Sequence, residues 1–138
     1  MKLVLAFDVG TSGCKAALVN EEGKLQGTAF EPYPTHYPRP LWAEQNPEDW
    51  WQATVSTIRK VLEESGVDPS EIRGVGLSGQ MHGAVFLDEH NKVIRPCILW
   101  CDQRTGSECE WITETIGRDK VIELTSNPVL TGFTAGKI

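Results

Sequence analysis

Near its start the chain reads Leu3-Val4-Leu5-Ala6-Phe7-Asp8-Val9-Gly10-Thr11-Ser12-Gly13. Residues 3–7 form an unbroken apolar run, which is typical of a strand that is buried on both faces. Residues 10–13 are small or carry hydroxyl groups, which indicates a tight turn. Residues 16–19 resume an apolar strand pattern, so the sequence predicts two strands joined by a short turn.

The next connection is equally short. Asn20-Glu21-Glu22-Gly23 has the composition of a hairpin turn, and residues 25–30 are typical of the returning strand. Strands joined this tightly are antiparallel, because a parallel connection needs a crossover of about a dozen residues or more. Further strands are predicted at residues 72–78, 84–87 and 93–100. We therefore expect an α/β domain with a mixed sheet and flanking helices.

The first predicted helix follows a loop at residues 31–46 that contains four prolines. Asn46 suits the N-cap, Pro47 suits the first helical position, and Gly66 suits the end of the helix. Apolar side chains recur at helical spacing and are expected to face the core. They are Trp51, Val55, Ile58 and Leu62.

A second helix is predicted to begin at Thr105-Gly106-Ser107-Glu108, which matches a capping box. We expect it to end at Gly117. The side chains on its apolar face are Cys109, Ile112 and Ile116. A shorter helix is predicted at residues 119–124.

The composition excludes several classes of protein. The 138 residues are 40% hydrophobic and 23% charged, as in an ordinary globular domain, and the net charge of −6 argues against a nucleic-acid partner. No stretch has the length and apolarity of a membrane span. The four cysteines lack the spacing of a zinc site, and without a secretion signal they indicate reduced thiols. We expect a cytoplasmic protein without nucleic-acid or membrane partners; the sequence leaves its oligomeric state, including a homodimer, open.

One glycine pattern is misleading. Residues 74–79 match the dinucleotide fingerprint GxGxxG letter for letter. That fingerprint requires a strand before the glycines and a helix that opens at them. Here the glycines lie within the predicted strand 72–78 and a further strand follows, so we reject dinucleotide binding.

The turn after the first strand has chemistry of its own. Gly10 and Gly13 would let backbone N–H groups approach phosphate oxygens, and the hydroxyls of Thr11 and Ser12 could add donors. Asp8, at the end of the strand, could hold a hydrated Mg²⁺. The spacing does not match a Walker loop. On physical grounds alone, a plain hairpin turn explains these residues equally well.

Longer motifs resemble a known family. They are Asp8-Val9-Gly10-Thr11-Ser12, Leu41-Trp42-Ala43-Glu44-Gln45-Asn46-Pro47-Glu48-Asp49-Trp50-Trp51, Leu77-Ser78-Gly79-Gln80-Met81-His82-Gly83-Ala84, and Ile98-Leu99-Trp100-Cys101-Asp102-Gln103-Arg104. Together they resemble the FGGY carbohydrate kinases and, within them, the xylulokinases. The resemblance covers essentially the whole chain, and its last two motifs are the most specific. It implies a ribonuclease-H-like fold of the actin-like ATPase superfamily, with two lobes and an active site between them.

The resemblance also implies substrates and residue roles. ATP and Mg²⁺ would be co-substrates, and D-xylulose would be the acceptor, giving D-xylulose 5-phosphate. The residues implied are Asp8 for the metal (through water), Thr11, Ser12, Gly13 and Lys15 for the phosphates, Met81 and His82 for the sugar, and Trp100, Asp102 and Arg104 at or beside the sugar pocket. Glycerol kinases carry an Arg-Glu pair where Met81-His82 stands, which argues against glycerol as the acceptor.

The physical character of these residues agrees with a sugar site. A sugar needs hydrogen-bonding groups such as Gln80, His82 and Asp102, and a flat apolar wall such as Trp100. An isolated histidine is more often a satisfied core residue, but the flanking glycines and the second polar cluster favour a sugar contact for His82. Trp50 and Trp51 are expected to pack in the core.

The catalytic base is expected elsewhere. Phosphoryl transfer needs an acceptor for the proton of the attacking hydroxyl, and the resemblance places that aspartate in a later motif. We therefore expect residues 1–138 to be an N-terminal domain that is truncated before its end, lacks the C-terminal lobe and is inactive alone. The alternatives are a non-catalytic sugar-binding or sensing module, which would not need the Asp8 turn, and an actin-like or chaperone ATPase, which the Gln80-Met81-His82 cluster does not suit.

Overall fold

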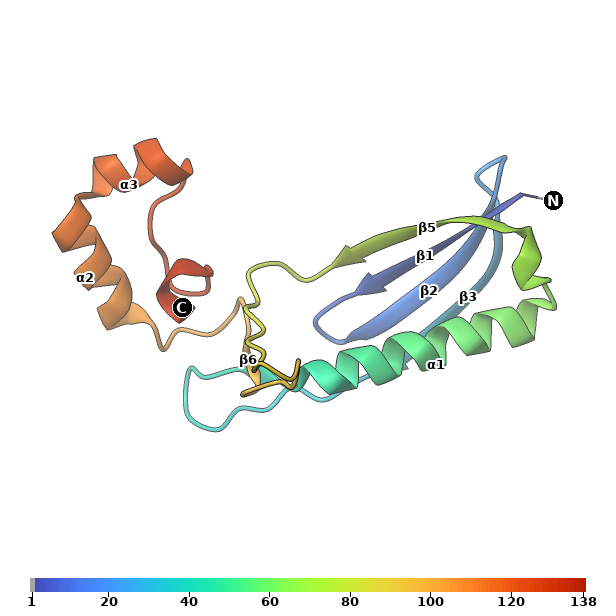
Figure 1. Ribbon diagram of the computed structural model, residues 1–138, viewed down its shortest axis with the longest axis horizontal. Coiled ribbons are helices and arrows are strands. Elements are labelled where there is room, and N and C mark those ends of the chain that lie inside the picture. Colours follow the sequence, from blue (N-terminus) through green and yellow to red (C-terminus); the bar gives the residue numbers. More distant parts are fainter. Residues whose placement is uncertain (1) are drawn as a thin grey trace. The chain divides into compact units, whose positions relative to one another are not determined.

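The computed structural model describes residues 2–138, and its internal contacts divide them into two units (Figure 1). The first, which we call the sheet unit, comprises the described chain up to Pro34 and the segment Pro47–Gln80. The second unit comprises Thr35–Asn46 and Met81–Ile138. Each unit is described by itself below.

The sheet unit contains a four-stranded sheet in the order β3-β2-β1-β5. Strand β1 (Leu3–Val9) pairs antiparallel with β2 (Gly13–Asn20), which pairs antiparallel with β3 (Leu25–Pro32). Strand β5 (Ile72–Gly79) pairs parallel with β1. The parallel pairing is possible because helix α1 (Pro47–Ser65) provides the crossover. The prediction of a mixed sheet is thereby confirmed.

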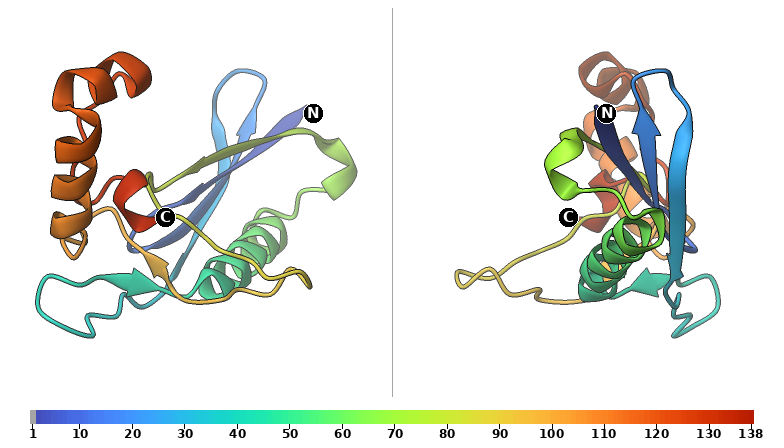
Figure 2. Two further views of the ribbon diagram at one scale, coloured as in Figure 1. Left: turned by 60° about the vertical axis from the view of Figure 1, so that its left-hand side comes forward. Right: turned by 90° about the vertical axis from the view of Figure 1, so that its right-hand side faces the viewer.

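Helix α1 lies along one face of this sheet (Figures 1 and 2). Gly66, with φ of 64°, ends the helix as predicted. A core of Leu5, Ala16, Leu18 and Val61 fills the space beneath it, with Ile58 and Leu62 packed at its margin.

The buried face of α1 differs from the predicted one. Its fully buried residues include Thr54 and Thr57, whereas Trp51 is 61% exposed, so the prediction that Trp51 packs in the core is wrong. The two threonines can be buried because each hydroxyl donates a hydrogen bond to the carbonyl four residues earlier, at Trp50 and Ala53. The prediction for Trp50 is confirmed, since it packs against the cluster around Ala53.

Strand β5 forms one edge of the sheet and is poorly covered. Its register places Val75 beside Leu5 and Leu77 beside Phe7, so these pairs share the face on which α1 packs. Val75 and Leu77 are nevertheless 65% and 72% exposed.

The second unit has short strands and short helices. Strand β4 (Glu44–Gln45) pairs antiparallel with β6 (Cys97–Ile98). Helices α2 (Gly106–Ile116) and α3 (Arg118–Thr125) meet at Gly117 (Figure 2). Single 3₁₀ turns occur at Pro69–Glu71 in the sheet unit and at Ala135–Lys137 here.

Two predicted strands in this unit are not formed. Residues 84–87 and 93–100 make only the isolated bridge Leu87↔Val93 and the two-residue β6. Residues 87–96 are exposed and therefore lack an apolar layer to pack against, and Pro96 cannot donate to a ladder.

The helices α2 and α3 confirm their predictions with one difference. Gly117 ends α2 with φ of 89°, as expected. The predicted capping box does not form, because Thr105 makes no side-chain cap hydrogen bond. Its hydroxyl lies 3.8 Å from the Cys109 sulfur instead.

Candidate active site

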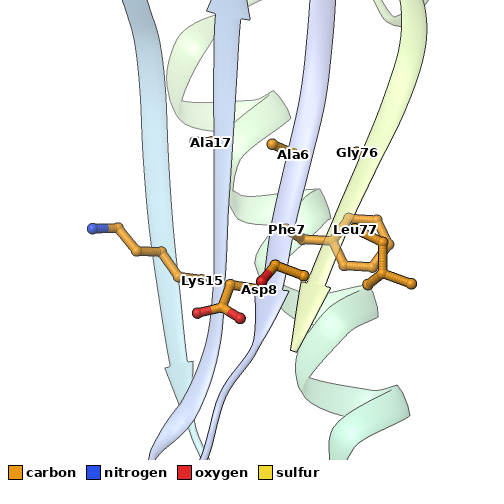
Figure 3. A pocket seen from close by; sticks show the side chains of 8 residues that line it. Ala6, Phe7, Asp8, Lys15, Ala17, Gly76 and Leu77 are labelled. Carbon is orange, nitrogen blue, oxygen red and sulfur yellow. The ribbon is translucent and has the colours of Figure 1, made fainter. Parts of the chain in front are cut away.

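The carboxylate of Asp8 stands on the open face of the sheet. Phe7 packs against the core under α1, so the next residue along β1 points to the opposite face. Asp8 lies in register with Lys15 on β2 and Ser78 on β5, and both Asp8 and Lys15 are exposed (Figure 3). Within residues 2–138 the Asp8 carboxylate forms no hydrogen bond or ion pair. It is therefore available to a ligand.

An open hollow of about 350 Å³ lies beside Asp8. Small residues of three neighbouring strands, among them Ala6, Ala17 and Gly76, form much of its lining (Figure 3). Phe7 and Leu77 also contribute to the lining, but the small residues Ala6, Ala17 and Gly76 leave room next to the carboxylate.

The turn that follows Asp8 is tightly held. The Gly10 amide donates to the Gly13 carbonyl at 3.1 Å, and the Tyr33 hydroxyl donates to the Gly10 carbonyl. A side chain at position 13 would have its Cβ only 2.5 Å from the Glu31 carbonyl oxygen, so this position requires glycine. Burial raises the pKa of Tyr33 to about 12, with smaller contributions from Cys14 and Asp8. Even at the ordinary tyrosine pKa of about 10 the hydroxyl is protonated near neutral pH and can donate.

Gln80 lies beside this turn. The Thr11 hydroxyl donates to the Gln80 side-chain oxygen at 3.3 Å, and the Gln80 amide donates to the Val9 carbonyl at 2.8 Å. The sheet unit therefore brings Gln80, predicted to contact the sugar, next to a residue predicted to contact phosphate. Ser12, a further predicted phosphate ligand, is exposed.

The other predicted sugar residues belong to the second unit. His82 has a left-handed backbone with φ of 63°, and its ring stacks on Phe133 with 4.4 Å between the centroids. Met81 and Trp100 are 48% and 40% exposed. These side chains are accessible to a ligand.

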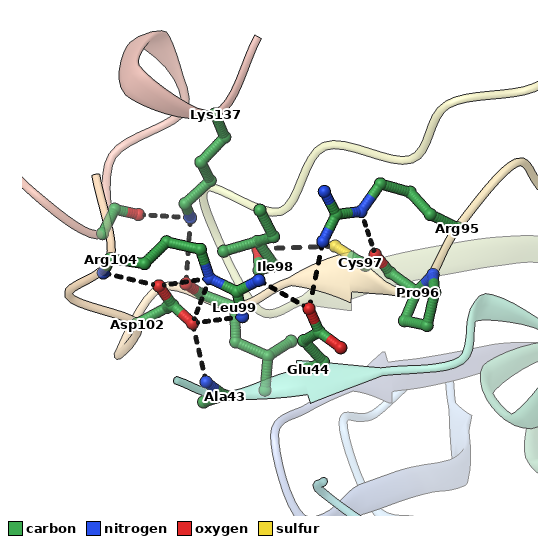
Figure 4. Close-up of polar contacts among 11 residues, drawn as sticks. Ala43, Glu44, Arg95, Pro96, Cys97, Ile98, Leu99, Asp102, Arg104 and Lys137 are labelled. Atoms are coloured by element: carbon green, nitrogen blue, oxygen red, sulfur yellow. Dashed lines mark hydrogen bonds and ion pairs between the residues drawn. The ribbon is translucent and has the colours of Figure 1, made fainter. Parts of the chain in front are cut away.

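Asp102 and Arg104 form a buried ion pair (Figure 4). The Arg104 side chain and backbone amide donate to both Asp102 oxygens at 2.7–3.0 Å, and the Ala43 amide donates at 2.7 Å. These donors occupy the acceptor positions of one carboxylate. Arg104 also pairs with Glu44 at 2.6 Å and lies 3.7 Å above the Trp42 ring. The prediction that Asp102 and Arg104 lie at or beside the sugar pocket stays a prediction. The hydrogen bond from the Ala43 amide indicates that Asp102 also holds the backbone at Ala43.

Hydrogen bonds stabilise the charged forms of both Asp102 and Arg104. Burial alone would raise the pKa of Asp102, but hydrogen bonds from Arg104 and the Ala43 amide outweigh burial and hold that pKa below its usual value. Burial likewise opposes the charge on Arg104, yet its bonds to Asp102 and Glu44 raise the pKa of the guanidinium.

A magnesium ion fits the Asp8 site in one way only. Among residues 2–138 no group of three or more His, Cys, Asp or Glu side chains is placed to hold a metal. Mg²⁺ keeps several waters and needs only one or two protein carboxylates when phosphate oxygens complete its shell. The single free carboxylate of Asp8 therefore suits a metal that is bound together with phosphates.

Sequence reasoning missed Tyr33, Phe133 and Lys137. Each acts through a contact with a residue more than twenty positions away in the chain. Only the isolated lysine in a run of small and apolar residues at 132–138 offered a signal.

No helix in the described part of the chain is long and apolar enough to cross a membrane.

Comparison with known proteins shows the family. Residues 3–138 match the N-terminal domain of the FGGY family of carbohydrate kinases. The chain is 42% identical over 138 residues to the xylulose kinase of Bacillus subtilis, with 100% of this chain and 28% of that protein covered. It is 38% identical over 136 residues to the xylulose kinase of Escherichia coli, with 99% and 27% covered.

A solved structure gives the same result. The "xyloylose kinase" of Brucella ovis superimposes with a TM-score of 0.90 at 40% identity, with 98% of this chain and 28% of that one covered. The chain thus spans between a quarter and a third of the length of the relatives that it matches. The match confirms the predicted actin-like ATPase fold, and the chain belongs to the FGGY family of carbohydrate kinases.

Proposed function

We propose that a full-length protein carrying this chain transfers the terminal phosphate of ATP to a ketopentose. The acceptor is D-xylulose and the product is D-xylulose 5-phosphate. The observation that carries the proposal is the free carboxylate of Asp8, which lies beside a hollow and ahead of a fixed turn. Family membership and the names of the most similar relatives support the choice of a sugar as the acceptor.

The sheet unit supplies the phosphate side of the reaction. Asp8 would hold the hydrated Mg²⁺ that accompanies ATP, which when bound would supply positive charge to offset the phosphates. The Ser12 hydroxyl and the Gly13 amide donate hydrogen bonds to phosphate oxygens, and the Thr11 hydroxyl does so when its single proton turns away from the Gln80 oxygen. Lys15 adds a positive charge on the face of the sheet that carries Asp8.

The sugar is held by neutral groups. His82 hydrogen-bonds a hydroxyl, Gln80 provides a further polar contact, and Met81 and Trp100 cover the apolar C–H face of the sugar. Asp102 and Arg104 act from beside the pocket by fixing the backbone. The proton of the attacking hydroxyl passes to an aspartate that family resemblance places beyond residue 138.

A coupled ADP-release assay tests this function. We expect the full-length protein to release ADP when D-xylulose, ATP and Mg²⁺ are present, and to release less with glycerol. Residues 1–138 alone should show no sugar-dependent release, because the proton acceptor and the adenosine pocket are supplied elsewhere. Sugar binding without turnover by the full-length protein would instead indicate a sensing module. Turnover by the purified 138-residue chain would refute its expected inactivity.

His82→Ala tests the sugar contact in the full-length protein. Loss of one polar contact costs about 1–3 kcal/mol, so the KM for D-xylulose should rise roughly ten- to a hundredfold. The KM for ATP should change little. Steady-state kinetics with each substrate varied in turn measure both values. Equal losses for both substrates, together with a lower melting temperature, would identify His82 as a core residue.

A further inference from the structure

Lys137 is buried, with only 9% of its surface exposed, yet it forms no ion pair within residues 2–138. Its ammonium group donates to three backbone carbonyls instead. These belong to His82 at 2.9 Å, Leu99 at 3.0 Å and Gly132 at 2.6 Å. An ammonium has three N–H donors, so the three carbonyls use its full capacity. Figure 4 shows the ammonium reaching toward the backbone near Leu99.

The three carbonyls come from separate parts of the second unit. Two of them adjoin predicted sugar residues, because the first is the carbonyl of His82 and the second directly precedes Trp100. The third, at Gly132, lies on the segment that carries Lys137 itself. A Cβ at position 132 would lie 2.1 Å from the Trp100 carbonyl oxygen, so this segment passes very close to the Trp100 backbone.

The same segment holds His82 through two further contacts. The ring of Phe133 stacks on the imidazole at 4.4 Å with an interplanar angle of 23°. The Thr134 hydroxyl lies 3.4 Å from the His82 carbonyl and donates to it weakly. His82 has φ of 63°, a conformation that is uncommon for a residue with a side chain and that contacts with the surroundings can hold in place. Residues 132–137 provide those surroundings.

We propose that Lys137 is a positioning residue for sugar binding, which fixes the backbone of His82 so that the imidazole meets the sugar in one orientation. This inference rests on the proposed function, in which His82 contacts the sugar. A lysine suits the task because its ammonium is a compact group whose donors diverge toward three carbonyls, whereas the guanidinium of arginine is a planar fork. Burial, which leaves 9% of Lys137 exposed, lowers the pKa of its ammonium group.

The substitution Lys137→Met in the full-length protein tests the proposal, since it keeps the length of the side chain and removes the donors. We expect the KM for D-xylulose to rise about tenfold while the KM for ATP stays within about twofold. In a His82→Ala background the same substitution should change the sugar KM by less than about twofold, because residues that act through one another are not additive. Lys120→Met, which alters an exposed lysine paired with Glu123, is the matched control and should be neutral.

A second readout does not depend on sugar. The ring protons of His82, assigned by their loss in His82→Ala, report the stacking on Phe133 through its ring current. Lys137→Met should shift these NMR signals, and Lys120→Met should leave them in place. If Lys137→Met does not fold, Phe133→Leu removes the stacking while keeping the lysine, and it should raise the sugar KM in the wild-type background only.

The outcomes separate the two claims. Unmoved ring signals, or an equal rise in sugar KM with and without His82, would overturn the positioning role. Moved ring signals with an unchanged sugar KM would overturn its link to sugar binding. Failure of the proposed function appears differently, as a wild-type protein with no ketose-dependent turnover.

Discussion

Asp8→Asn should lower the kcat of the full-length protein by about two to three orders of magnitude, while its melting temperature and its affinity for the sugar stay close to wild type. Asparagine keeps the size of the side chain and one carbonyl oxygen. Any role in shaping the turn would survive the change. What disappears is the negative charge that organises a hydrated Mg²⁺ against the repulsion of the phosphates.

The surroundings of Asp8 explain why the fold should tolerate this change. Its carboxylate is exposed on the open face of the sheet and forms no hydrogen bond or ion pair within residues 2–138. The turn is fixed by other groups, namely the Gly10–Gly13 hydrogen bond and the Tyr33 hydroxyl. Loss of the Asp8 charge therefore leaves no buried partner unsatisfied.

The measurement is kcat as a function of Mg²⁺ concentration, together with sugar titration by calorimetry. Asp119→Asn, which changes a fully exposed carboxylate in the first turn of α3, is the matched control and should leave kcat unchanged. Near-normal kcat for Asp8→Asn at ordinary Mg²⁺ concentrations would remove Asp8 from the active site.

Asp102→Ala should lower the free energy of unfolding by about 3–5 kcal/mol, because it leaves the buried part of Arg104 without its main partner. It also leaves the Ala43 amide without its acceptor. Arg104 keeps Glu44 and the Trp42 ring, so the loss should lie toward the lower end of that range. Urea titration of the variant measures the effect, with Asp119→Ala as the control for removing an exposed carboxylate.

The same pair predicts a dependence on pH. The pKa of Asp102 is lower in the folded protein than in the unfolded chain, so the unfolded state binds the proton more readily. The stabilisation by Asp102 is therefore complete above its unfolded pKa, about 4, and is lost as pH falls through its lower folded pKa. Asp102→Asn should lack this part of the acid-induced loss. An unchanged acid profile in that variant would contradict the assignment.

The four strands of the sheet unit and the turn after β1 could be predicted because their signals are local. The apolar run at residues 3–7, the short turns after it and the glycine that ends α1 each follow from neighbouring residues. The buried face of α1 could not be predicted from hydrophobicity, because Thr54 and Thr57 satisfy their own hydroxyls and so replace larger apolar side chains.

Contacts between distant residues explain the other differences. Residues 93–100 have strand-like composition, but they form a named strand only at Cys97–Ile98, where Glu44–Gln45 approaches, and otherwise make only the isolated bridge between Val93 and Leu87. Family motifs located His82 and Asp102 in the sequence. They did not indicate that Phe133 stacks on His82. Nor did they indicate that Arg104 and the Ala43 amide together donate to both carboxylate oxygens of Asp102.

The exposed strand β5 has a consequence for the behaviour of the isolated chain in solution. In the part of the chain that the structure describes, the backbone groups on the outer edge of β5 pair with no other strand. The side chains of Val75 and Leu77 on this strand are apolar and exposed. An uncovered edge of this kind is a template for strand addition by a second molecule. Wherever no other part of the protein covers this edge, two copies can pair through their β5 strands and bury Val75 and Leu77 of each copy. The substitution Leu77→Lys would oppose that aggregation, because a charge on an edge strand resists burial in such a junction.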